Sequence, residues 1–294
     1  MVNDEPMADS TDSTETDSTE TDSTDTDSTE TDSTELLLTD ISAGVATLTL
    51  NRPERKNSLS AELVDALGDG LDAAMTNDDV RVVVLTNSGN TFCAGADLKA
   101  QAPGVSAQAK HSFVGVMQQI MNAPKPVIGR ANGHAIAGGV GLIAACDISV
   151  MRDDAKIGFT EARIGVSPAV ISVVCLPKMR RADASELFLT AERFTPQRAA
   201  DVGLINAAVP ADQLDEVIEE YLDKVVRGGP LALAACKELI TRVPNMSTEE
   251  AFDWATPFSA ELFQSAEGQA GIAAFNERKP APWIPAERAG TENR

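Results

Sequence analysis

The chain is short of basic residues and cysteines, and each shortage argues against a class of protein. Its 24 lysines and arginines face 45 aspartates and glutamates, which gives a net charge of −21 at pH 7. Nucleic-acid binding needs a basic face, so this balance argues against that function. No apolar run approaches the roughly 18 residues that a membrane-spanning helix needs, so we expect no membrane segment.

The cysteines and histidines are also too few and too scattered for a metal centre. Cys93, Cys146, Cys175 and Cys236 are widely spaced and include no CxxC pair. We therefore expect free thiols, a cytoplasmic location and no bound metal. The chain also lacks a Walker loop, a GxGxxG dinucleotide motif and a GxSxG nucleophile elbow, so we expect no nucleotide cofactor.

The first 35 residues differ in kind from the rest. Residues 1–35 contain 13 acidic residues and no lysine or arginine, and residues 9–35 contain no apolar residue. Such a segment cannot bury enough apolar surface to offset chain entropy, which predicts a disordered, acidic Ser/Thr-rich tail. It lacks the apolar core of a signal peptide and the basic residues of a transit peptide. An acidic interaction tail and a solvated extension both fit.

The remaining residues, 36–294, are enough for one large domain with a full core. Taking the 13 acids of the tail from the net charge leaves −8, with 9 lysines against 15 arginines. This lysine-poor, acid-rich composition suggests a protein adapted to high salt (a halophilic one), which is a hypothesis about its environment.

Strand and helix signals alternate along the first two thirds of this body. Buried strands are predicted at 45–50 (VATLTL), 81–86 (RVVVLT), 125–129 and 148–151. Helices are predicted from Ser60 to about Gly68 and Gly70, and over 106–122, 138–145, 195–201, 212–226, 230–242 and 248–278. This order predicts an α/β fold with a parallel sheet in residues 36–230, followed by a helical region in 231–294.

Two glycine-bearing turns carry the first chemical signal. One is CAGADLK at 93–99, after a buried strand, and the other is NGHAIAGGVG at 132–141, which leads into a helix. Glycine lets backbone approach a ligand closely, and free N–H groups at a helix start bind negative charge. Two such turns could form an oxyanion hole, although close packing alone would also explain each glycine.

The motifs together resemble the enoyl-CoA hydratase/isomerase (crotonase) family. They are NRP at 51–53, FCAGADLK at 92–99, KPVI at 125–128, NGHAIAGG at 132–139, ACDI at 145–148, FTEARIG at 159–165, LTAERFT at 189–195 and AADVGLI at 199–205. The resemblance implies a ClpP/crotonase-like spiral of ββα units with a helical C-terminal trimerisation and lid region. It implies a homotrimer or a dimer of trimers. It also implies an acyl-CoA substrate, so that coenzyme A arrives with the substrate and no other cofactor is needed.

Residue by residue, the resemblance implies an oxyanion hole made by the backbone N–H groups of Ala96 and Gly138. Two preorganised donors would stabilise the enolate that forms when the α carbon of a thioester reacts. The resemblance also implies which residues lie near the coenzyme A arm of the substrate, namely one continuous segment and several separate lysines and arginines. They are Lys56, Asp97, Leu98 and Lys99, with Arg278 or Lys279 as further phosphate partners.

One carboxylate, Glu161, is implied as the catalytic acid and base. Hydratases of the family use two glutamates, but the first position of that pair is Gly141 here. We predict an enoyl-CoA hydratase that converts a 2-enoyl-CoA to a 3-hydroxyacyl-CoA. Two alternatives stay open: a Δ3–Δ2 enoyl-CoA isomerase with Glu161 as its only acid and base, and a protein of this fold that binds acyl-CoA without turnover.

Three other polar residues have simpler explanations. We expect His134 to be a hydrogen-bonded turn residue, Asp147 to cap backbone between a helix and a strand, and His111 to be solvated.

Overall fold

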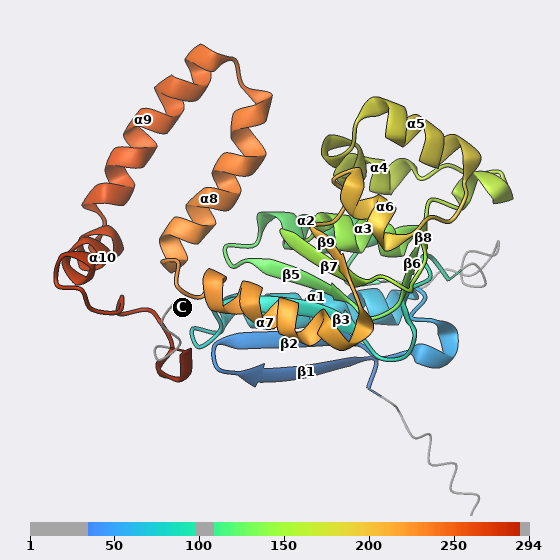
Figure 1. The fold of residues 1–294 in the computed structure, drawn as a ribbon, viewed down its shortest axis with the longest axis horizontal. Helices are drawn as coiled ribbons and strands as arrows, with labels where there is room; N and C mark the ends of the chain where they lie inside the picture. The colour runs from blue at the N-terminus through green and yellow to red at the C-terminus, as the bar shows by residue number, and fades with distance from the viewer. Residues whose placement is uncertain (1–34, 98–108, 289–294) are drawn as a thin grey trace, which may run out of the picture. The chain divides into compact units, whose positions relative to one another are not determined.

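The core of the protein is a six-stranded sheet with a three-stranded sheet beside it, as the computed structural model shows (Figure 1). The structure describes residues 35–97 and 109–288, and these fall in one compact unit. The larger sheet has the strand order β1-β2-β3-β5-β7-β9, and only its β1–β2 pair is antiparallel. The smaller sheet is parallel, in the order β4-β6-β8.

In the described ranges, the strands are β1 (Leu37–Ser42), β2 (Val45–Leu50), β3 (Val82–Asn87), β4 (Thr91–Cys93), β5 (Val127–Ala131), β6 (His134–Ile136), β7 (Ile148–Arg152), β8 (Ile157–Gly158) and β9 (Ala207–Val209). The α-helices are α1 (Ala61–Thr76), α2 (Phe113–Asn122), α3 (Gly138–Ala145), α4 (Ala169–Cys175), α5 (Arg181–Thr190), α6 (Pro196–Asp201), α7 (Leu214–Val225), α8 (Pro230–Arg242), α9 (Thr248–Gln264) and α10 (Ala266–Asn276). Short 3₁₀ turns include η2 (Glu161–Ile164) and η3 (Leu176–Lys178).

Two strands and a helix repeat along the chain. The successions β3-β4-α2, β5-β6-α3 and β7-β8-η2-α4 each place their first strand in the large sheet and their second in the small one. Parallel neighbours need such crossovers, and consecutive turns of the same kind stack as a spiral. The predicted alternation of strands and helices is therefore confirmed, with the short second strands added.

Both faces of the large sheet are covered. Alternate residues of β3 point to opposite faces: Val83 and Leu85 pack in the core that includes α1, whereas Val82 and Val84 pack against Leu214, Ile218 and Leu222 of α7. All six residues of β3 are buried. This explains its continuous apolar sequence, which is typical of a strand covered on both sides.

Helix α1 continues past the two glycines that were expected to end it. Ser60 caps its first turn as predicted, because the hydroxyl accepts a hydrogen bond from the backbone N–H of Leu63. Gly68 and Gly70 both lie inside the helix. A Cβ on Gly68 would collide with the ring of His111, and a Cβ on Gly70 would lie 2.5 Å from Leu37 Cδ2. These glycines therefore serve close packing and not termination.

Other boundaries also differ from the sequence prediction. Helix α2, predicted over 106–122, begins at Phe113, because the Ser112 hydroxyl accepts a hydrogen bond from the Gly115 N–H and caps the helix there. The first residues of the predicted range, 106–108, lie outside the described residues. The helix expected over 248–278 is two helices, α9 and α10, separated at Ser265. Ser265 has an extended backbone, and its hydroxyl accepts a hydrogen bond from Gly268 N–H at 2.9 Å, so it caps α10.

From α8 to α10, residues 230–276, the described chain is mainly helical. Helices α9 and α10 contain no buried residue, and their large apolar side chains include Phe252, 69% exposed, and Phe275, 83% exposed. Helix α8 is held to the core through Lys237, whose ammonium lies 2.6 Å from Asp147 Oδ2 and donates to the Ile120 carbonyl. Among the described residues, no helix is long and apolar enough to cross a membrane.

Candidate active site

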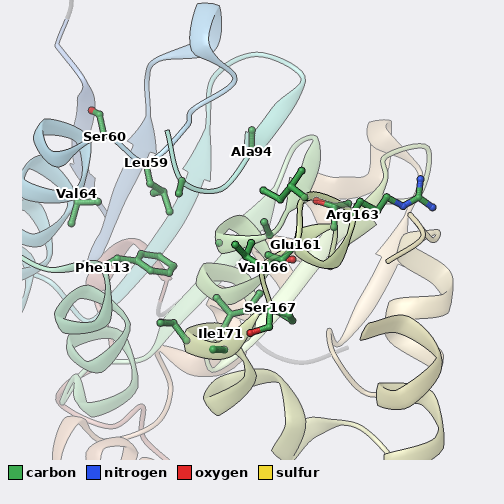
Figure 2. A pocket seen from close by; sticks show the side chains of 18 of the residues that line it. Leu59, Ser60, Val64, Ala94, Phe113, Glu161, Arg163, Val166, Ser167 and Ile171 are labelled. Atoms are coloured by element: carbon green, nitrogen blue, oxygen red, sulfur yellow. The ribbon is translucent and has the colours of Figure 1, made fainter. Parts of the chain in front are cut away.

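A cavity of about 1180 Å³ opens beside the small sheet (Figure 2). Leu59, Val64 and Phe113 lie on one side of it, and Glu161, with residues of η2 and α4, lies on the other. Ala96 and Gly138, predicted as oxyanion donors, also line it. The structure therefore brings Ala96, Gly138 and Glu161 into one cavity, although they are far apart in the sequence.

The register of the small sheet explains why these three residues meet. Thr91 of β4 pairs with His134 of β6, and Ala135 and Ile136 of β6 pair with Ile157 and Gly158 of β8. Ala96, Gly138 and Glu161 each follow the carboxyl end of one of these strands within three residues. Parallel strands present their carboxyl ends at one edge, where ligand sites of parallel sheets commonly form.

Glycine brings the two backbone segments of the predicted oxyanion hole into contact. Gly95 has φ +86°, and a Cβ there would lie 2.9 Å from Ala137 Cβ and 3.1 Å from the Gly138 nitrogen. A Cβ on Gly139 would collide with the carbonyl of Cys93. Side chains at these two positions would therefore push the segments apart.

The backbone immediately before α3 is strained. Ala137 has φ 51° and ψ −119°, a conformation that residues other than glycine rarely adopt. It forms the sharp turn from β6 into α3, and its own N–H donates to the Gly158 carbonyl at 2.9 Å. Neither Ala96 N–H nor Gly138 N–H donates a hydrogen bond to another described residue.

Glu161 begins η2 just after β8. Phe159, two residues before Glu161, is fully buried, and the centroid of its ring lies 4.4 Å from that of Phe188. This contact anchors the segment that carries Glu161. Burial raises the pKa of the Glu161 carboxyl above its ordinary value. Its Oε2 atom is buried and receives no hydrogen bond from any described residue. A buried, unpaired carboxylate oxygen is unusual and suits a group that exchanges protons with a ligand.

The position of the absent first glutamate is filled by packing. Gly141 is buried in α3, and a Cβ there would collide with Ile171 Cγ2 and lie 3.0 Å from Ile171 Cβ and 3.3 Å from Met117 Sδ. Ile171, in α4, is 3% exposed and lines the cavity. The described side chains therefore leave no room for a larger residue at 141, and this part of the wall is apolar.

The residues predicted near coenzyme A are placed less clearly. Leu98 and Lys99 lie outside the described residues. Lys56 is exposed, and its backbone carbonyl accepts a hydrogen bond from Ala94 N–H at 3.1 Å. Asp97 forms an ion pair with Arg52 at 3.2 Å. Neither Lys56 nor Asp97 lines the cavity, so their contact with coenzyme A stays a prediction.

Asp147 caps backbone as expected, and His134 is hydrogen-bonded as expected but lies in strand β6 and not in a turn. His134 Nδ1 accepts a hydrogen bond from Lys156 N–H at 2.9 Å, and burial lowers the pKa of its imidazole. Asp147 accepts from the Val127 N–H at 2.7 Å, as a capping residue would, but it also pairs with Lys237. Burial is the main influence on the Asp147 carboxyl and raises its pKa.

The expectation for His111 is wrong. Its side chain is only 14% exposed, because the ring packs on Gly68 in α1 and Nε2 lies 2.8 Å from Asp69 Oδ1. His111, Asp69 and Asp72 bring possible ligand atoms within 4.8 Å of one another. The two aspartates are exposed, and Asp69 is paired with Lys110, so the group reads as a surface ion-pair cluster.

Sequence reasoning missed the apolar wall of the cavity. Phe113, Val166 and Ile171 line it, and Figure 2 shows Arg163 extending away from these groups. The helix predicted over 106–122 contained one of them, Phe113, but gave no sign that this residue faces a cavity. The contribution of α4 was not visible, because this helix is seven residues long and carries no start signal.

Comparisons with known proteins identify the family of this chain. Residues 40–285 match the enoyl-CoA hydratase/isomerase family. An enoyl-CoA hydratase of Mycobacterium tuberculosis is 33% identical over 79% of this chain and 90% of its own length. The (E)-benzylidenesuccinyl-CoA hydratase of Thauera aromatica is 30% identical over 82% of this chain and 95% of its own length.

The solved structures confirm the predicted crotonase-like fold. The crystal structure of an enoyl-CoA hydratase from Mycobacterium smegmatis has a TM-score of 0.77 and 33% identity to this chain, covering 84% of this chain and 98% of that one. Together, the matched family, these relatives and the shared fold show that the chain belongs to the enoyl-CoA hydratase/isomerase family.

Proposed function

We propose that this protein is an enoyl-CoA hydratase that adds water across the double bond of a 2-enoyl-CoA, with Glu161 as its acid and base. The observation that carries the proposal is the buried Glu161 Oε2, which has no hydrogen-bond partner among the described residues, in a cavity that Ala96 and Gly138 also line. The relatives named as hydratases support hydration as the reaction.

A single carboxylate can balance the reaction. The thioester oxygen of the substrate would accept hydrogen bonds from Ala96 N–H and Gly138 N–H, so that negative charge can develop on it. The Glu161 carboxylate takes a proton from water while the hydroxide adds to the β carbon, which leaves an enolate. Glu161 then returns that proton to the α carbon, and the thioester carbonyl re-forms. One proton enters and leaves the carboxyl group, so no second acid is required.

The packing around Gly141 favours a second candidate, a Δ3–Δ2 enoyl-CoA isomerase. With Ile171 filling the space beside Gly141, no second carboxylate reaches the reacting carbons from that position. Isomerisation needs only one: Glu161 would remove a proton from the α carbon of a 3-enoyl-CoA and return it to the γ carbon. The same oxyanion donors would hold the intermediate enolate.

A direct assay separates these reactions. Purified protein at high salt is incubated with crotonyl-CoA and, separately, with a 3-enoyl-CoA, and the absorbance of the conjugated thioester is followed. Its loss from crotonyl-CoA supports hydration, and its appearance from the 3-enoyl-CoA supports isomerisation. If neither changes while a saturated acyl-CoA still binds in calorimetry, the hydratase proposal is wrong and the non-catalytic alternative stands.

The assembly and location follow as parts of the same proposal. Homotrimers or dimers of trimers would cover the exposed apolar side chains of α9 and α10, such as Phe252 and Phe275. We expect a cytoplasmic protein whose only bound organic group is the coenzyme A of its substrate. Analytical ultracentrifugation of the full chain gives the mass of the assembly, and a monomer at micromolar concentration would contradict the trimer.

A further inference from the structure

An ion pair lies directly behind the segment that carries the Ala96 N–H. Arg52 Nη1 donates to Asp97 Oδ2 at 3.2 Å, and the same nitrogen donates to the Ser58 carbonyl at 3.4 Å. The Ser58 hydroxyl lies 3.5 Å from the same Asp97 oxygen. Asp97 is the residue after Ala96, yet neither Arg52 nor Asp97 lines the cavity. Among the described residues, the backbone of residues 96 and 97 is what connects this pair to the cavity.

Backbone hydrogen bonds connect this pair to the candidate donor. Leu59 N–H donates to the Gly95 carbonyl at 2.8 Å, and Asp97 N–H donates to the Leu59 carbonyl at 3.2 Å. Leu59 and Ala96 thus face each other in a one-residue parallel bridge. In this bridge the flanking residues make the bonds, and the Ala96 N–H is turned away from them.

The base of the loop that carries Arg52 is rigid. Asn57 is fully buried with φ 49°, and its side chain donates to the Thr91 carbonyl at 2.7 Å and accepts from Arg52 N–H at 2.7 Å. One end of the 91–97 segment is therefore held by Asn57 and the other by Arg52 through Asp97.

We propose that Arg52 and Asp97 are positioning residues that fix the direction of the Ala96 N–H in the oxyanion hole. This inference rests on the proposed function, because it assigns a role in holding the thioester oxygen. Arg52 and Asp97 are 21% and 17% exposed at their side chains, and partly exposed ion pairs contribute little to global stability. A displacement of a donor by about 1 Å, in contrast, can slow a reaction by about 100-fold.

The test measures turnover and the polarisation of a bound thioester in Arg52→Gln, Asp97→Asn and the double variant. The probe is a cinnamoyl-CoA with a para-dimethylamino group, whose absorption moves to longer wavelength when its thioester oxygen is polarised. Arg52→Lys is the conservative variant, which keeps a cation for Asp97. Arg130→Gln is the matched control, because Arg130 is 19% exposed, pairs with Asp215 and does not line this cavity.

We expect Arg52→Gln and Asp97→Asn each to lower kcat by about 10- to 100-fold, with KM changed less than about threefold. The shift of the probe should shrink in both, and the double variant should be no worse than the worse single one. Arg52→Lys should keep most of the shift, and Arg130→Gln all of it.

Contrary results are distinct from failure of the proposed function. If the parent protein shifts the probe and both folded single variants shift it equally, the positioning role is wrong while the hydratase proposal survives. If Arg52→Gln unfolds, Asp97→Asn carries the test: a smaller probe shift in folded Asp97→Asn supports the role, and an unchanged shift there overturns it. If the parent protein neither shifts the probe nor turns over crotonyl-CoA, the proposed function is wrong, and this inference, which depends on it, is wrong as well.

Discussion

The packing between Gly141 and Ile171 predicts a strong coupling between substitutions at these two positions. Alanine is a better helix former than glycine by about 1 kcal/mol, so Gly141→Ala in α3 would stabilise the protein if space were open. The added methyl group would instead collide with Ile171 Cγ2. Overpacking of a rigid core costs about 1–3 kcal/mol, so we expect net destabilisation.

The second substitution should relieve this collision. Ile171 is 3% exposed, and Ile171→Ala alone should cost about 2–4 kcal/mol through lost packing and a cavity. In the double variant the collision with Cγ2 is gone, and only the Ile171 Cβ position, 3.0 Å away, stays close. We therefore expect the double variant to be more stable than the sum of the single effects by about 1–2 kcal/mol.

Urea unfolding of the four proteins at one fixed protein concentration measures this coupling. A matched cycle with Gly141→Ala and Val174→Ala provides the control, because Val174 is buried in the same helix as Ile171 but is not among the nearest neighbours of a Cβ at 141. Additive effects within about 0.5 kcal/mol for the Ile171 cycle would refute the claim that Ile171 fills the space of the absent glutamate.

Four further predictions concern the site and its support. Ala137→Gly should stabilise the protein by about 1 kcal/mol, because glycine adopts φ 51° without strain; an unchanged or lower urea midpoint would count against strain there. Lys237→Met leaves the Asp147 carboxylate, 25% exposed, without its cation and should cost about 2 kcal/mol, and a loss below about 0.5 kcal/mol in urea unfolding would contradict a stabilising role of this pair. Because burial raises the pKa of Glu161, kcat/KM should fall as the pH falls through that raised pKa, at a higher pH than for an ordinary glutamate. The same shift makes the charged form unfavourable in the folded state, so Glu161→Gln should be the more stable protein above the raised pKa and lose that advantage below about pH 4.5; equal urea midpoints at pH 8 would contradict this.

The elements that could be predicted from the sequence are those whose burial is uniform. Strand β3 reads as a continuous β-branched run because both of its faces are covered, and α3 was predicted over its full length because its glycines precede an apolar stretch. The predicted end of helix α1 near Gly68 was too early for a physical reason. Gly68 makes room for His111, and nothing in the local sequence indicates a contact with a residue 43 positions away.

The short strands of the small sheet were out of reach for a different reason. Strands β4, β6 and β8 have three, three and two residues, too few for any alternation of apolar and polar residues to be seen. Their pairing nevertheless brings Ala96, Gly138 and Glu161 together. The residues of the candidate site could thus be named from a family resemblance, whereas the reason that they meet needed the structure.

The apolar wall of the cavity, formed in part by Ile171, could not be predicted from the sequence either. The family resemblance implies that Gly141 stands at the position of a first glutamate, but it does not show what occupies the space. Ile171 lies 30 positions further along, and its contact with Gly141 depends on the way α3 packs against α4. The ion pair of Arg52 with Asp97 was hidden in a similar way, because its two halves lie in separate loops.

The most direct test of the central claim, that Glu161 carries the chemistry, is the turnover of crotonyl-CoA by Glu161→Gln. Glutamine keeps the size of the side chain but cannot accept and return a proton, so we expect kcat to fall by at least about 100-fold. Butyryl-CoA, which cannot react, should bind to the variant and the parent protein with dissociation constants within about twofold in calorimetry. Undiminished turnover by a folded Glu161→Gln protein would contradict the account.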